Sequence, residues 1–209
     1  MIKIENTEVV GWKHAIRGMR NPMNSWDKSD SGIIDETIEP FHVGYNDLDL
    51  MKRLVNAGSD HRKFMRMIVV YTDIVAPLYW WKEFDTYKVG TVRNSCSTMH
   101  KIQAKEFTLN DFSCDWLLNS EEYLIPTIST LNRFRELFIE TKGKVYWWQM
   151  IQLLPSSYNQ RSTVMLNYEV LANMYHSRKN HKLDEWKDFC AWVETLPYSD
   201  LITGSEARE

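Results

Sequence analysis

A short strand that leads directly into a polar helix is the feature that most restricts how this chain can fold. The pattern predicts a strand over residues 162–166 and a helix that begins at once after it. Two carboxamides and a guanidinium lie at fixed offsets along this helix: Asn167, Asn173 and Arg178. Asn offers hydrogen-bond donors and acceptors together, and Arg a planar fork that suits a phosphate or a base edge. The pattern equally allows Asn167 to be an N-cap and the other two side chains to be solvated.

The rest of the chain predicts a helix-rich single domain of the α+β class, with a small central sheet, over residues 1–209. Hydrophobic residues make up 44% of the 209 residues, which is enough for a core of that size. Strands are expected over residues 1–10, 67–71 and 162–166, and helices over residues 11–20, 46–58, 77–88, 115–142, 144–153 and 183–196. The last of these helices is expected to be amphipathic, with an apolar stripe of Trp186, Phe189, Cys190 and Val193. Residues 25–32 and 89–100 are polar and predict loops.

Single residues refine these boundaries. Asn46 is expected to be an N-cap, and Gly58 to close the same helix at its C-terminal end. Pro126 is expected to end or kink the helix that contains it. Arg17 and Arg20 flank the break after the first helix and are expected to be surface charges, although they could reach an anion.

Charge and cysteine content exclude several classes of function. The net charge is −3 and no basic block dominates, so a nucleic acid is not an expected partner. The three cysteines are far apart and form no CxxC pair, which argues against a disulfide framework and against a metal site. No apolar run approaches the roughly 20 residues that a membrane-spanning helix needs. We therefore expect a cytoplasmic protein that has no metal and does not insert into a membrane.

The sequence from residue 150 to 195 resembles the C-terminal half of the flavin-dependent thymidylate synthases. In that family, Asn-(five residues)-Asn-(four residues)-Arg follows a Leu-Pro and a strand, and a His precedes the last helix. Here the corresponding residues are Leu154-Pro155, the set Asn167, Asn173 and Arg178, and then His181. The resemblance assigns the two Asn to FAD and Arg178 to the deoxyuridylate substrate. It extends over residues 10–200, and His61, which follows Gly58, matches a flavin-contacting His.

A second signature of the family is eroded. Where the family has Arg-His-Arg, counting from Ala76-Pro77, this chain has Thr86-Tyr87-Lys88. Lys88 keeps the charge but not the bidentate fork, and Tyr87 can stack on a ring. The resemblance places both with the cofactor. It places Glu83 and Ser97 with the substrate. We expect Arg93, a new cation in the loop, to contact the substrate as well and to compensate for the lost arginines. Ile151 and Met99 stand where the family has two further arginines.

The resemblance implies a homotetramer whose active sites are each built from several subunits. In the family, NADPH reduces FAD, and methylenetetrahydrofolate supplies the carbon that converts dUMP to dTMP. The protein orients the rings and needs no nucleophile, so no residue is assigned a catalytic role. The expected substrate is dUMP or a related pyrimidine nucleotide. Two alternatives stay open: an inactive or repurposed homologue that keeps the fold, and an interaction module without a small ligand.

Overall fold

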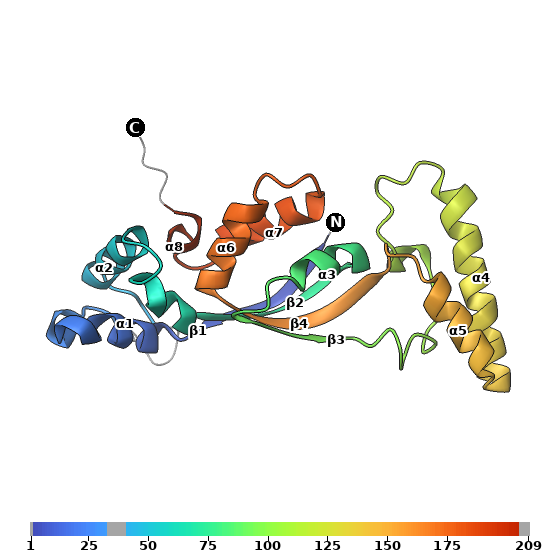
Figure 1. The fold of residues 1–209 in the computed structure, drawn as a ribbon, viewed down its shortest axis with the longest axis horizontal. Coiled ribbons are helices and arrows are strands. Elements are labelled where there is room, and N and C mark those ends of the chain that lie inside the picture. Colours follow the sequence, from blue (N-terminus) through green and yellow to red (C-terminus); the bar gives the residue numbers. More distant parts are fainter. Residues whose placement is uncertain (1, 33–40, 205–209) are drawn as a thin grey trace. The chain divides into compact units, whose positions relative to one another are not determined.

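A computed structural model describes residues 2–32 and 41–204 of the chain. Four strands form one antiparallel sheet in the order β1-β2-β4-β3 (Figure 1): β1 (Lys3–Val10), β2 (Val69–Pro77), β3 (Thr91–Ser95) and β4 (Asn159–Asn167). The α-helices are α1 (Trp12–Arg20), α2 (Tyr45–Asn56), α3 (Leu78–Phe84), α4 (Ser120–Thr141), α5 (Lys144–Leu153), α6 (Tyr168–Arg178), α7 (Asp184–Glu194) and α8 (Asp200–Thr203). The small sheet and the many helices confirm the predicted α+β class.

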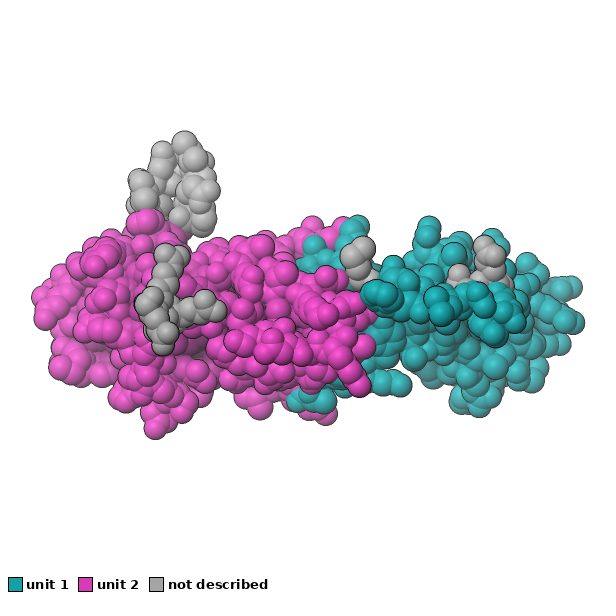
Figure 2. Space-filling view, turned by 90° about the horizontal axis from the view of Figure 1, so that it is seen from above, with its two compact units in different colours: residues 1–4, 73–86, 93–163 teal, residues 5–72, 87–92, 164–209 magenta. Residues whose placement is uncertain are grey.

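Contacts divide the chain into two compact units (Figure 2). Unit 1 contains residues 1–4, 73–86 and 93–163, and unit 2 contains residues 5–72, 87–92 and 164–209. The single domain expected over residues 1–209 stays a prediction. None of the helices in residues 2–32 and 41–204 is long and apolar enough to cross a membrane.

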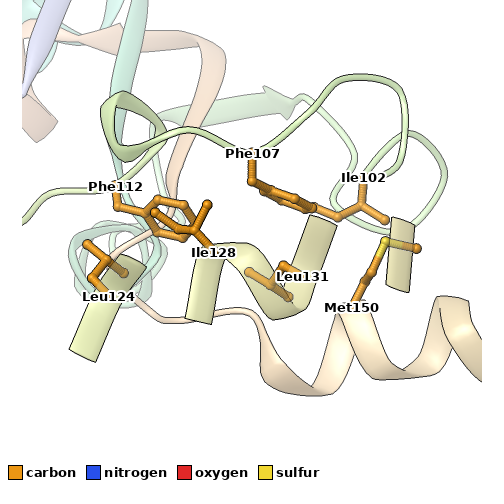
Figure 3. Packing of buried hydrophobic residues seen from close by; sticks show 7 residues of the cluster. All are labelled: Ile102, Phe107, Phe112, Leu124, Ile128, Leu131 and Met150. Atoms are coloured by element: carbon orange, nitrogen blue, oxygen red, sulfur yellow. The ribbon is translucent and has the colours of Figure 1, made fainter. Parts of the chain in front are cut away.

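Unit 1 is built around a pair of helices, α4 and α5. Seven buried apolar side chains form its core (Figure 3): Ile102, Phe107, Phe112, Leu124, Ile128, Leu131 and Met150. The first three come from the long connection between β3 and α4, so this polar-looking segment is held by a few large side chains. Unit 1 also buries Trp80, Trp81 and Phe84 of α3, whose rings meet at centroid distances of 4.9–5.2 Å.

Unit 2 packs α6 against α7 and against a 3-10 helix (Arg62–Met67), and the same 3-10 helix packs against α1. The stripe expected on α7 is buried as predicted and consists of Trp186, Phe189, Cys190 and Val193. Tyr168, at the start of α6, meets the edge of the Trp12 ring at 5.3 Å and donates its hydroxyl to the Pro197 carbonyl at 2.6 Å. These contacts fix the start of α6, at the point where the chain leaves β4.

The N-terminus of α2 differs from the prediction. Gly44, not Asn46, is the N-cap, and the carboxylate of Asp30 accepts the backbone N–H groups of Asn46 at 2.8 Å and Asp47 at 3.1 Å. A residue distant in sequence thus replaces a local cap, which no local pattern reveals. The C-terminal prediction is correct: Gly58 follows the C-cap and has a φ of +105°.

The boundaries of several other elements differ as well. Residues 91–95, expected within a loop, form β3. The strands β2 and β4 extend beyond the predicted ranges, and Pro126 does not end α4, which continues through it. The helix expected to run from Pro77 to Lys88 ends at Phe84. Thr86 satisfies the end of α3 because both its N–H and its hydroxyl donate to the Glu83 carbonyl. Tyr87 and Lys88 therefore leave the helix and enter the turn before β3.

Candidate functional site

The candidate site in unit 2 begins where β4 passes into α6. Asn167 is the N-cap of α6, and its side-chain oxygen accepts the N–H of Val170 at 2.9 Å. This confirms the N-cap interpretation. The cap uses only the side-chain oxygen, so the Nδ2 group of the carboxamide does not take part in it. Asn167 therefore both starts the helix and presents N–H groups at its positively polarised end.

A tight turn lies against this cap. The backbone N–H of Asn167 donates to the Gly90 carbonyl at 3.2 Å. Gly90 has a φ of +82°, and a Cβ there would come within 2.5 Å of the Asn167 Nδ2 atom. Only glycine combines this backbone conformation with so close an approach. The turn that carries Tyr87, Lys88 and Gly90 is thus fixed directly beside the first predicted flavin residue.

At the other end of α6, an aromatic frame surrounds Arg178. Its Nε–H donates to the Tyr87 hydroxyl at 2.9 Å. Its guanidinium carbon lies 4.8 Å from the centroid of the Trp186 ring and 5.5 Å from that of Tyr87. Both distances are within the range of cation–π attraction. The C-terminus of a helix also favours a cation, so local charge and packing together order this arginine.

Asn173 and His61 are exposed. Asn173 lies on α6 between Asn167 and Arg178, while Val170, Leu171 and Met174 of the same helix are buried. His61 immediately precedes a 3-10 helix (Arg62–Met67) that packs against α6. The position of His61 next to this contact agrees with its expected place beside the site, but its flavin contact stays a prediction.

Two arginines beside His61 were not identified from the sequence. Arg66 binds the carboxylate of Glu169 through two nitrogens, and this hydrogen bonding raises the pKa of the Arg66 guanidinium. The Nε atom of Arg62 lies 3.7 Å from the same carboxylate, is buried and makes no hydrogen bond with residues 2–32 or 41–204. The spacing of four residues between the arginines was the available signal, but the acidic partner in the first turn of α6 is remote in sequence.

The remaining predicted residues belong to unit 1. The guanidinium of Arg93 lies 3.8 Å above the Trp81 ring centroid and donates to Ser162 at 2.9 Å, to Asp85 at 2.7 Å and to Gln160 at 2.5 Å. All three of its nitrogens thus serve contacts within the fold. The structure identifies Arg93 as an anchor between α3, β3 and β4, and its contact with a nucleotide stays a prediction.

Ser97 shapes a turn. Its hydroxyl oxygen accepts the N–H groups of Met99 at 3.1 Å and His100 at 2.9 Å, so the hydroxyl proton is what it can offer to a phosphate. Ser97 also lines a cavity of about 240 Å³, together with Lys101 and Lys105. Glu83 is half-buried in α3. The structure therefore brings His61, Tyr87, Lys88, Asn167, Asn173 and Arg178 into unit 2, and Glu83, Arg93 and Ser97 into unit 1.

The arrangement of the helices and the sheet is the fold of the flavin-dependent thymidylate synthases. Two solved structures of thymidylate synthase X (ThyX) from Helicobacter pylori, both with FAD and dUMP, match this chain with TM-scores of 0.73 and 0.72. Each is 16% identical to it, and the matches cover 97% and 96% of this chain and 98% of the other. No family model and no curated protein sequence matches the chain. The predicted fold is confirmed, and at this identity the likeness concerns the fold.

Proposed function

We propose that this protein is a cytoplasmic, flavin-dependent enzyme that methylates dUMP or a related pyrimidine nucleotide. The observation that carries the proposal is the ordered guanidinium of Arg178, held by Tyr87 and Trp186 on the helix that Asn167 begins. The ThyX structures of the same fold hold FAD and dUMP. The spacing of the Asn, Asn and Arg residues supports the same two ligands here.

The residues of unit 2 fit a flavin nucleotide. The Nδ2 atom of Asn167 offers a hydrogen-bond donor, and the glycine at position 90 lets the backbone approach closely. We assign His61, Lys88, Asn167 and Asn173 to FAD.

We assign the nucleotide to Arg178 in unit 2. The assignment of Glu83, Arg93 and Ser97 of unit 1 to the substrate stays a prediction. When bound and reduced by NADPH, FAD supplies the electrons that turn a carbon from methylenetetrahydrofolate into a methyl group. The residues of the chain itself bind the cofactor and the nucleotide, orient their rings and exclude water from the site. A cysteine nucleophile is not needed, and Cys190 would serve poorly because burial raises the pKa of its thiol to about 11.

The first test is whether FAD stays bound after desalting, as shown by the visible absorption spectrum of the protein. The second is titration with dUMP, comparing Arg178→Ala with Lys179→Ala, an exposed neighbour on the same helix end. A charge-assisted hydrogen bond contributes about 1.5–3 kcal/mol, so Arg178→Ala should weaken dUMP binding by roughly ten- to one-hundred-fold. Lys179→Ala should leave it unchanged. Equal dUMP affinities in both variants would remove Arg178 from the site.

A repurposed homologue without methylation activity is the second candidate. The Thr86-Tyr87-Lys88 replacement and Ile151 favour it, because the corresponding family arginines are lost. The hydrogen bonds of Arg93 to Asp85 and Gln160 within unit 1 also favour a repurposed homologue. Nucleotide-dependent oxidation of the reduced flavin separates the two: the enzyme oxidises FADH₂ when dUMP and methylenetetrahydrofolate are present, whereas a repurposed protein does not.

A further inference from the structure

Tyr87 has a different environment from the one expected of a residue at its position. The resemblance places it at the His of the Arg-His-Arg signature, in contact with the flavin. In the structure its hydroxyl accepts the Nε–H of Arg178 at 2.9 Å, and its ring lies 6.3 Å from that of Trp186. The side chain thus spans from the turn before β3 to the last residue of α6.

The contacts around Arg178 restrict its orientation. Trp186 and Tyr87 both attract the guanidinium, and the hydrogen bond to the Tyr87 hydroxyl sets its rotation. An arginine free in solution samples many rotamers, and binding a ligand through it requires that freedom to be lost. The hydrogen bond from the Nε–H group to the Tyr87 hydroxyl adds a directional contact to the two ring contacts, so Tyr87 helps to order the guanidinium.

The turn that carries Tyr87 is itself anchored at two points. The Tyr87 carbonyl accepts the hydroxyl of Thr91, and the Gly90 carbonyl accepts the N–H of Asn167. The segment 87–90 therefore contacts both Asn167 and Arg178, the residues at the two ends of α6. A tyrosine suits this span because its hydroxyl reaches further from the backbone than either ring nitrogen of a histidine.

We infer that Tyr87 is a positioning residue that orients Arg178 toward a pyrimidine nucleoside monophosphate, rather than a residue that contacts the flavin. This inference rests on the proposed function, since it specifies how that site holds its nucleotide. It also explains how the chain keeps an ordered nucleotide arginine although the Arg-His-Arg signature is replaced. The flavin contacts then belong to Asn167, Asn173 and their neighbours.

The test compares Tyr87→Phe, which removes one hydroxyl and keeps the ring, with Tyr175→Phe. Tyr175 lies on α6 as well, and its hydroxyl donates to Glu194 at 2.7 Å, so the control loses the same atom from the same unit. FAD affinity is measured by quenching of flavin fluorescence, and dUMP affinity by calorimetry on the FAD-loaded protein. Tyr87→Phe should raise the Kd for dUMP about tenfold and leave the Kd for FAD within about twofold. Tyr175→Phe should change neither.

A loss of FAD affinity in Tyr87→Phe with unchanged dUMP affinity would overturn the inference, because Tyr87 would then be a flavin contact. Unchanged affinities for both ligands would overturn it as well. A double-mutant cycle of Tyr87→Phe with Arg178→Lys, followed by urea unfolding, tests the contact without any ligand. Additive effects in that cycle would show that the contact does not order Arg178. If the unsubstituted protein binds FAD but no nucleotide, coupling in the cycle marks a structural contact, and the positioning role is rejected together with the nucleotide site.

Discussion

At the scale of single residues, the buried ion pair of Arg20 and Asp47 is the charged contact on which the stability of unit 2 most clearly depends. Arg20 donates its Nε–H to Asp47 at 2.6 Å, and the Asp47 side chain is completely buried. The hydroxyls of Ser29 at 2.7 Å and Ser31 at 2.6 Å donate to the other carboxylate oxygen. The expectation that Arg20 is a surface charge is therefore wrong. The partners of Arg20 lie beyond the end of α1, so the helical periodicity of the sequence could not reveal them.

Replacing Asp47 with Asn should destabilise the protein by about 3–5 kcal/mol, because it leaves the Arg20 guanidinium buried without its counter-ion. Urea unfolding of Asp47→Asn, compared with Asp49→Asn, measures this effect. Asp49 is half-exposed and pairs with Arg53 on the same helix, so its replacement should cost less than about 1 kcal/mol. Equal losses in the two variants would show that the buried pair adds nothing beyond a surface pair.

The same pair predicts a pH dependence. Burial by itself raises the pKa of Asp47, but the hydrogen bonds from Ser31, Ser29 and Arg20 outweigh it and lower that pKa below its ordinary value of 3.8. A carboxyl with a lowered pKa binds fewer protons in the folded than in the unfolded state. Its contribution is complete above the ordinary value and is lost as the pH falls through the folded pKa. The stability difference between the unsubstituted protein and Asp47→Asn should therefore shrink below about pH 4.

At the scale of elements, Gly90 joins the turn before β3 to the start of α6. Gly90→Ala should cost about 1–3 kcal/mol, because φ is +82° and the new Cβ would meet the Asn167 side chain. Gly58→Ala is the matched control: its φ is +105°, but apart from its chain neighbours no atom of the part of the chain that the structure describes lies within 4 Å of the new Cβ. Thermal unfolding of both variants separates the backbone strain, which they share, from the collision, which is specific to Gly90. If Asn167 holds flavin, Gly90→Ala alone should also weaken FAD binding.

The elements differ in how far the sequence could predict them. The boundaries of α5 were predicted fully, and the buried stripe of α7 was predicted too, because their apolar periodicity and the flanking proline are local signals. β3 was missed because Thr91–Ser95 is polar, and the strand exists because β4 pairs with it. Within the candidate site, Asn167, Asn173 and Arg178 follow from their spacing along one helix. The frame around Arg178 does not, because Tyr87 and Trp186 reach it from other segments.

At the scale of the whole molecule, we expect a homotetramer, which the resemblance implies. Helices α4 and α5 expose several large apolar side chains, among them Tyr123 at 58%, Val145 at 59% and Trp148 at 41%. Exposed apolar side chains of this size are typical of surfaces that other subunits cover. Subunit contacts at these helices would explain why unit 1 leaves them uncovered although it has a core of its own.

Sedimentation of the FAD-loaded protein should therefore give about four times the chain mass of 24.8 kDa. Val145→Glu should lower this mass, because a charge at a covered position of α5 costs several kcal/mol when it is desolvated without a partner. Lys144→Glu, next to it and exposed, should leave the assembly intact because that position already carries a charge. If each site is built from several subunits, as the resemblance implies, Val145→Glu should also lose FAD on dilution while its far-ultraviolet circular dichroism is unchanged. A tetramer that survives Val145→Glu with its flavin would show that α5 lies outside the subunit interface.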